Sequence, residues 1–182
     1  MVIIIGRLCQ CEGGIMRLNL NEIIEVPGKS VSFECELDAE RLFVPSVLSF
    51  DEAPKAEGIV KNSAGALTLT GHIKADMLRA CDRCMGEYRQ EKVLELNVPL
   101  AFDMEDDENP DIFPIEEDGW LDLSEVLETC FILDMEAKSL CKEDCAGLCQ
   151  TCGANLNHGK CSCRAAVDPR LAVLGQLLDI ED

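Results

Sequence analysis

Twelve cysteines occur in this chain of 182 residues, and most of them lie in tight pairs. The pairs Cys81–Cys84 and Cys149–Cys152 are spaced C-x-x-C, and the pair Cys161–Cys163 is spaced C-x-C. Widely spread cysteines are typical of a secreted disulfide scaffold, whereas closely paired thiols are typical of metal ligands in a reducing compartment. The pairing therefore predicts a metal-binding protein, and the cytoplasm is the location consistent with it.

The strongest candidate site begins at Cys149-Gln-Thr-Cys152-Gly153, a sequence typical of the turn in zinc ribbons. Its two-residue spacer lets both sulfurs reach one ion, and backbone N–H groups of the turn can stabilise the thiolates. Gly153 can adopt the positive φ that such a turn requires. With Cys161 and Cys163 the segment offers four soft ligands, the closed tetrahedral set expected of a structural zinc.

A second candidate site combines Cys81 and Cys84, which Gly86 follows closely, with Cys141 and Cys145. A redox C-x-x-C usually opens a helix, whereas this one lies between two strand-like runs, which favours metal. The four cysteines would form a second all-cysteine site that pins the C-terminal module to the sheet. A single zinc bound by a different subset of cysteines is the alternative, so the sequence predicts one or two structural zinc ions.

The ligand types argue against catalysis. A catalytic zinc keeps one position open for water and needs an acid or base beside it, and four cysteines leave no such position. Of the two histidines, His72 is expected on the outward face of a strand and His158 in the loop of the C-terminal module, where it could replace a cysteine ligand. The chain also lacks a phosphate-binding glycine loop. We therefore expect no enzyme and no small-molecule substrate.

Alternating apolar and polar residues over 31–37, 67–75 and 94–100 predict half-buried strands of an antiparallel sheet. Asp122 and Glu125 then resemble a helix start, and apolar residues at helical spacing predict one helix over about 123–135. Cys35 and Cys130 lie on the apolar sides of these elements, so we expect both in the core.

The fold class we expect is α+β: an antiparallel β-sheet domain covered by helices, with a C-terminal cysteine-rich module resembling a zinc ribbon. The β-rich domain would span 16–136, with a short helix or lead-in over 17–29 and an acidic solvated loop over 103–118. The zinc module and a closing helix after Asp168-Pro169 would span 137–182. Residues 1–15 lack the features of a secretory signal and are expected to be an upstream start or disordered extension.

The net charge of −19 bears on partners. It opposes broad attachment to a nucleic-acid backbone or an anionic membrane, and it favours basic partners, of which ribosomal proteins are one class. No run of about 20 apolar residues could span a membrane. Between Cys141 and Arg170 the chain is near neutral, so this segment is the better place for any direct RNA contact.

The run Cys141-Lys-Glu-Asp-Cys145-Ala-Gly-Leu-Cys149-Gln-Thr-Cys152-Gly-Ala-Asn-Leu-Asn157, followed by Cys161-Ser-Cys163, resembles the C-terminal signature of the bacterial YceD family. That family is also called the large ribosomal RNA subunit accumulation proteins. The supporting motifs follow in the same order over about 16–178: Pro27-Gly-Lys-Ser30, Cys81-x-x-Cys84, the acidic stretch, Leu121-Asp-Leu-Ser124 and Asp168-Pro-Arg-Leu171. By matching position, the metal residues implied are Cys81, Cys84, Cys141, Cys145, Cys149, Cys152, Cys161 and Cys163.

The resemblance implies a role in the synthesis, processing or accumulation of large-subunit ribosomal RNA, without a defined mechanism. We therefore expect a non-enzymatic zinc-binding factor in ribosome biogenesis, whose partner is precursor ribosomal RNA or a basic ribosomal protein. The alternative is a zinc-stabilised protein-interaction module, or a redox-responsive one, with no link to ribosomes.

Overall fold

The computed structural model describes residues 9–12, 15–102 and 112–163. The chain divides into two compact units. The first comprises residues 1–79 and 88–137, and the second comprises 80–87 and 138–182. The turn that carries Cys81 and Cys84 therefore belongs to the second unit, although the two strands that flank it belong to the sheet of the first unit.

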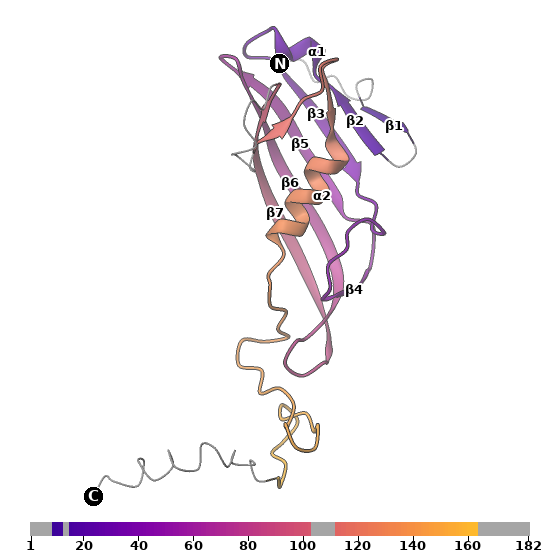
Figure 1. Cartoon of the computed structure of the whole chain (residues 1–182), viewed down its shortest axis with the longest axis vertical. Coiled ribbons are helices and arrows are strands. Elements are labelled where there is room, and N and C mark those ends of the chain that lie inside the picture. Colours follow the sequence, from indigo (N-terminus) through magenta and orange to yellow (C-terminus); the bar gives the residue numbers. More distant parts are fainter. Residues whose placement is uncertain (1–8, 13–14, 103–111, 164–182) are drawn as a thin grey trace, which may run out of the picture. The chain divides into compact units, whose positions relative to one another are not determined.

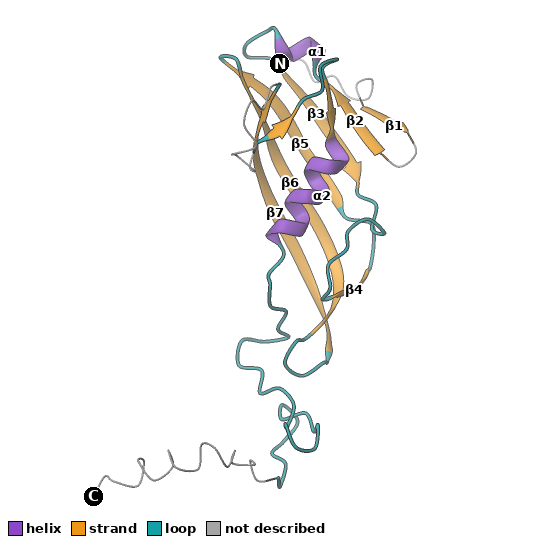
Figure 2. Cartoon of the chain, viewed as in Figure 1, coloured by secondary structure: helices purple, strands orange, loops and turns teal. Residues whose placement is uncertain are grey.

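The first unit is built on a six-stranded sheet (Figures 1 and 2). Along its main path the order is β3-β5-β6-β7-β8, and β4 also pairs with β6. The strands are β3 (Ser30–Glu36), β4 (Val47–Phe50), β5 (Lys55–Ser63), β6 (Ala66–Ala80), β7 (Glu87–Ala101) and β8 (Phe113–Pro114). The antiparallel pairing that we expected holds for β3–β5, β4–β6 and β5–β6, but β7 and β8 run parallel, so the sheet is mixed.

The alternating pattern of the sequence explains which face of this sheet is buried. Leu67, Leu69, Ile73 and Ala75 of β6 are buried, as their period of two predicts. The β5–β6 hairpin closes through Ala64 and Gly65, both at positive φ (53° and 97°), which is the turn geometry that matches the twist of the two strands.

A close approach of β5 and β6 requires glycine on both strands. Gly58 and Gly71 face each other in the register. A Cβ atom on Gly58 would lie 2.5 Å from the Thr70 carbonyl oxygen and 2.8 Å from the Phe33 ring, so no larger residue fits without displacing the partner strand.

The N-terminal region agrees with expectation only in part. A small antiparallel sheet has the order β1-β2-β9, from β1 (Cys9–Glu12), β2 (Ile15–Asn19) and β9 (Trp120–Asp122). The segment 17–29 begins with the end of β2 and contains the expected short helix, α1 (Asn21–Ile24). Residues 9–12 pair with β2, which was not expected. The reason is tertiary, because β2 gains its second partner from residues about a hundred positions away.

Helix α2 (Leu123–Asp134) agrees with the expected helix and lies across one face of the larger sheet (Figure 1). Asp122 caps it, because its side chain accepts the N–H of Glu125 at 3.0 Å. Leu127 and Phe131 are buried in one core with Leu69 and Ile73 of the sheet, which fixes the helix by apolar burial. No helix among the described residues is long and apolar enough to cross a membrane.

Two further expectations concern the acidic loop and the closing helix. Residues 103–111 of the loop 103–118 lie outside the described residues, and the described remainder contains β8 and a turn before β9. The closing helix after Asp168 also lies outside them. In the second unit, residues 138–163 form turns with one isolated β-bridge, between Leu148 and Asn155, so the zinc-ribbon fold stays a prediction.

Candidate metal centres

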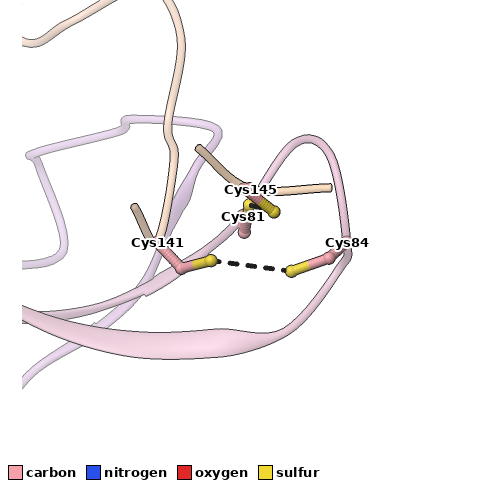
Figure 3. A group of neighbouring side chains, drawn as sticks. All are labelled: Cys81, Cys84, Cys141 and Cys145. Carbon is pink, nitrogen blue, oxygen red and sulfur yellow. Dashed lines mark hydrogen bonds between the residues drawn. The ribbon is translucent and has the colours of Figure 1, made fainter. Parts of the chain in front are cut away.

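The first group of cysteines, here called the hairpin group, contains Cys81, Cys84, Cys141 and Cys145. Their four sulfur atoms lie within 4.8 Å of one another, although 57 to 64 residues separate the paired segments (Figure 3). Cys81 and Cys84 come from the turn between β6 and β7, and Cys141 and Cys145 come from the segment after α2. The structure thus brings together the four cysteines of the second candidate site.

The second group, here called the C-terminal group, contains Cys149, Cys152, Cys161 and Cys163. Their sulfur atoms also lie within 4.8 Å of one another. Cys152 and Cys163 are exposed. In the hairpin group Cys141 is half-buried and the other three cysteines are buried. The eight candidate ligands therefore separate into two sets of four, each confined to the second unit.

Both C-x-x-C turns have the same backbone geometry. The N–H that follows the second cysteine donates to the carbonyl of the first: Met85 to Cys81 at 2.8 Å and Gly153 to Cys149 at 2.9 Å. Both donor residues have positive φ, 56° and 72°. Gly153 adopts this conformation as expected, whereas in the hairpin group Met85, and not Gly86, occupies the corresponding position. The N–H of Thr151 also points at the Cys149 sulfur, at 3.4 Å, as a turn that stabilises a thiolate should.

The sulfur separations fit a tetrahedral metal site. The Cys81 and Cys145 sulfurs are 3.8 Å apart, and those of Cys84 and Cys141 are 3.7 Å apart. A disulfide would require about 2.05 Å. Four sulfurs placed about 2.3 Å from a central zinc lie about 3.8 Å from one another. These two separations and the four thiols are compatible with a four-thiolate metal site.

Hydrogen bonding and burial lower the pKa of one thiol in each group and raise the pKa of another. Burial acts to raise the pKa of Cys81, but backbone N–H groups, first that of Cys141, outweigh it and lower this pKa to about 6. Backbone N–H groups of Cys152 and Thr151 lower the pKa of Cys149 to about 6. Burial raises the pKa of Cys141 to about 12, and the hydrogen bond with Cys152 raises that of Cys163 to about 12. Four clustered thiolates repel one another, so full ionisation of either group needs a cation.

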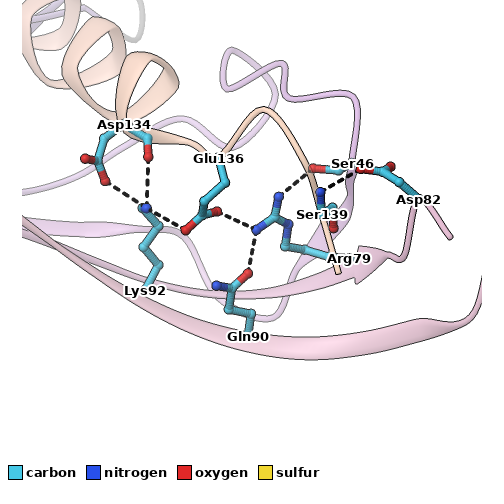
Figure 4. Close-up of polar contacts among 8 residues, drawn as sticks. All are labelled: Ser46, Arg79, Asp82, Gln90, Lys92, Asp134, Glu136 and Ser139. Carbon is cyan, nitrogen blue, oxygen red and sulfur yellow. Dashed lines mark hydrogen bonds and ion pairs between the residues drawn. The ribbon is translucent and has the colours of Figure 1, made fainter. Parts of the chain in front are cut away.

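Polar contacts tie the hairpin turn to the segment that supplies Cys141 and Cys145. Asp82 and Ser139 exchange two hydrogen bonds: Asp82 N–H donates to the Ser139 carbonyl at 2.8 Å, and Ser139 N–H donates to the Asp82 carboxylate at 2.6 Å (Figure 4). The Arg83 guanidinium donates to the Cys145 carbonyl at 3.1 Å. The types of these residues carry no pattern that would reveal the contacts from the sequence.

A side chain outside both groups contacts a ligand sulfur. The Asn157 amide donates to the Cys145 sulfur at 3.3 Å, and this hydrogen bond is the main cause that lowers the pKa of the Cys145 thiol. Asn157 lies between Cys152 and Cys161 in the sequence, within the loop of the other group. In the sequence, Asn157 is part of the family signature, but its residue type and spacing indicate no role.

The first unit contains a buried ionic network that the sequence does not predict (Figure 4). Arg79 has only 1% of its surface exposed, and its guanidinium donates to Glu136 at 2.8 Å, to Gln90 at 2.5 Å and to Ser46 at 2.8 Å. Lys92 contacts the same Glu136 carboxylate at 3.3 Å. Because Arg79 and Glu136 precede the two segments of the hairpin group, the network fixes both chain segments where they leave the first unit.

The remaining cysteines and histidines lie outside the two groups. Cys35 belongs to the core and Cys130 packs against it, as expected. His72 pairs with Glu57 at 3.0 Å on the neighbouring strand, and His158 is exposed and belongs to neither group.

Fold and site together define an α+β protein with two candidate four-cysteine metal centres. A sequence model of the family described as large ribosomal RNA subunit accumulation protein YceD matches residues 69–178, more than half of the chain. The chain therefore belongs to the YceD family, which confirms the resemblance noted in the sequence.

Two kinds of relatives are similar to the chain. The first is the large ribosomal RNA subunit accumulation protein YCED homolog 1, chloroplastic, of Arabidopsis thaliana, 28% identical over 61% of this chain and 44% of its own length. Uncharacterized proteins of Mycobacterium bovis and Mycobacterium tuberculosis are each 26% identical over 67% of this chain and 60% of their own length. The chain thus spans only about half of the length of these relatives. No solved structure is significantly similar to it.

Proposed function

We propose that this chain is a non-enzymatic, zinc-stabilised factor in ribosome biogenesis that supports the accumulation of large-subunit ribosomal RNA. The observation that carries the proposal is the pair of four-cysteine groups in a chain of the YceD family. The name of the Arabidopsis relative, a large ribosomal RNA subunit accumulation protein homolog, points to the same process.

Zinc is the metal that the donor set favours. Thiolate ligands select zinc or iron–sulfur chemistry over the hard cations, and the two C-x-x-C turns are built to direct two sulfurs at one ion. Cys81, Cys84, Cys141 and Cys145 would hold one zinc, and Cys149, Cys152, Cys161 and Cys163 the other. In each centre four cysteines occupy all tetrahedral positions, so the metal would supply stability and no bound water for catalysis.

The partner that the charge favours is a basic protein of the large subunit. A net charge of −19 repels the phosphate backbone and attracts lysine- and arginine-rich segments. Crosslinking in cells with the intact chain tests this point: recovery of basic large-subunit proteins supports it, and recovery of ribosomal RNA crosslinked directly to the chain contradicts it.

Elemental analysis of the purified chain tests the metal. We expect two zinc ions per chain and one in each of the variants Cys81→Ser and Cys149→Ser, with two retained in the control Cys130→Ser, whose thiol lies outside both groups. A single zinc that is lost from both variants would exclude the two-centre arrangement.

Depletion of the protein in its own organism tests the process. We expect a fall in large-subunit relative to small-subunit ribosomal RNA, restored by the wild-type chain and by Cys130→Ser but not by Cys81→Ser. Normal large-subunit RNA after full depletion would remove the ribosomal role and leave the interaction-module alternative.

The exposure of the C-terminal group supports a second candidate function, a redox-responsive module. Cys152 and Cys163 are exposed, and accessible thiolates are the ones that peroxide oxidises first. Under this alternative, mild oxidation would release zinc and change partner binding together. Unchanged partner binding after zinc release would exclude it.

A further inference from the structure

The two cysteine groups share one short stretch of backbone. The hairpin group ends at Cys145 and the C-terminal group begins at Cys149, only four residues later. Leu148 forms a β-bridge with Asn155, Cys149 N–H donates to the Ala154 carbonyl at 2.8 Å, and Leu156 N–H donates to the Gly147 carbonyl at 2.9 Å. The segment 145–149 is therefore held against the loop 153–160 that the ligands of the C-terminal group enclose.

From this loop, the Asn157 side chain contacts a sulfur of the other group. Its amide N–H donates to the Cys145 sulfur at 3.3 Å, and its amide oxygen accepts the Ala146 N–H at 2.9 Å. The amide is thus fixed at both ends against the chain that carries the ligand. An N–H donor aimed at a thiolate offsets its negative charge and orients it, and loss of such contacts to ligands typically weakens metal binding by about 10- to 100-fold.

The position of Asn157 is itself set by its own loop. Asn155 accepts both the backbone N–H of Asn157 at 3.0 Å and its amide N–H at 2.8 Å. Cys152 precedes this turn and Cys161 follows it, so a metal held by the C-terminal group closes the loop and restricts Asn157 to its contact with Cys145. With the loop open, ordering Asn157 would cost conformational entropy.

We propose that Asn157 couples the two metal centres, so that metal in the C-terminal group strengthens metal binding by the hairpin group. This rests on the proposed zinc binding and adds to it a coupling between the affinities of the two centres. Because coupling between two sites is reciprocal, metal in the hairpin group also strengthens binding by the C-terminal group.

Occupancy of each group can be measured separately in the full-length chain. At a series of buffered free zinc concentrations, unprotected thiols are alkylated and mapped by peptide mass spectrometry. The half-protection concentrations of Cys81 and Cys149 then report the two groups. Native mass spectrometry counts the zinc ions, and circular dichroism confirms that each variant keeps its fold.

Two substitutions separate the donor from the rest of the side chain. Asn157→Asp keeps an oxygen for the Ala146 N–H, but it removes the donor to the Cys145 sulfur and to Asn155 and adds a negative charge beside the sulfur. Asn157→Ala removes all three side-chain contacts. We expect half-protection of Cys81 to need about tenfold more zinc in Asn157→Ala and more again in Asn157→Asp. The control His158→Ala changes the adjacent exposed residue of the same loop and should leave Cys81 unaffected.

The decisive comparison combines these variants with an emptied C-terminal group, made by Cys149→Ser with Cys161→Ser. Emptying the group should weaken protection of Cys81, and adding Asn157→Ala should weaken it no further, because both changes remove the same contact. Protection of Cys81 that is unchanged by Asn157→Ala, or two effects that multiply, would overturn the coupling. If no cysteine of the wild type is protected by zinc, the metal proposal itself fails, which is a distinct result.

Discussion

The hairpin group and the C-terminal group have the same four ligands but are assembled in opposite ways. The hairpin group joins segments 57 or more residues apart, and Cys81 and Cys145 are 0% and 3% exposed. The C-terminal group draws all its ligands from 149–163, and Cys152 and Cys163 are exposed. A local group can form as soon as its loop closes, whereas a distant group requires much of the chain to be folded first.

The comparison also shows where metal binding is coupled to folding. A metal that joins distant segments closes a long loop, so its binding free energy contributes directly to the stability of the fold. A metal that closes a short loop orders little beyond that loop. We therefore expect the two centres to differ in stability, acid resistance and reactivity, and the following tests examine that difference.

The largest expected effect comes from the hairpin group. Removal of a structural zinc costs on the order of 10 kcal/mol of binding free energy at neutral pH. Both variants should lose one zinc, but only Cys81→Ser opens the long loop between the two segments of the hairpin group. Cys81→Ser should therefore lower the thermal midpoint of the chain far more than Cys149→Ser does. Calorimetry with Cys130→Ser as control measures this, and an equal loss of stability in both cysteine variants would contradict the comparison.

Acid should release zinc from both groups. Cys81 and Cys149 each have a pKa lowered to about 6, below the ordinary thiol value of 9.0. A lowered pKa means that the contribution of the thiolate is present above the unfolded value and is lost as pH falls through the folded one. Protons compete with zinc for these thiolates, and bound zinc itself favours the ionised form, so zinc should stay bound at pH 7 and be released at a pH below the metal-free value of about 6. A chromogenic chelator follows the release, and the exposed C-terminal group should lose its metal first. Simultaneous loss at one pH would remove the difference.

Oxidation should distinguish the groups by access. Where zinc holds all four cysteines of each group as thiolates, reactivity follows access, so limiting peroxide should modify the exposed Cys152 and Cys163 faster than the buried Cys81 and Cys145. Burial also raises the pKa of Cys130, which should react slowly and serves as an internal reference. Peptide mapping over time gives the order, and early modification of Cys81 would show that the hairpin group opens readily.

The smallest effect concerns the contacts that support only the hairpin group. Asp82→Ala removes a charge-assisted hydrogen bond to the Ser139 N–H at 2.6 Å, which costs about 1.5–3 kcal/mol. Half-protection of Cys81 should then need about tenfold more zinc. Cys149, which responds only through the coupling between the two groups, should change less. Glu143→Ala, which removes another acidic side chain of the second unit, is the control. A larger shift at Cys149 than at Cys81 would show that Asp82 does not act through the hairpin group.

Much of the architecture is accessible from the sequence because its signals are local. The alternation over 67–75, the capped helix from Leu123 and the C-x-x-C turns each depend on near neighbours, and the structure contains each of them. By contrast, β2, β4 and β9 are short strands that pair with partners distant in the sequence. Their few residues do not form an alternating pattern long enough to predict a strand. Their pairing is decided by what the rest of the fold places alongside.

The sequence by itself determined the donor chemistry: eight cysteines at spacings that suit zinc, and one set of four that is complete within fifteen residues. Only the tertiary structure placed Cys81 and Cys84 beside Cys141 and Cys145, within 4.8 Å, and only it directed Asn157 at the Cys145 sulfur. The physical reason is range. Ligand type and turn geometry depend on a few consecutive residues, whereas the distance between two turns depends on every strand, helix and buried contact between them.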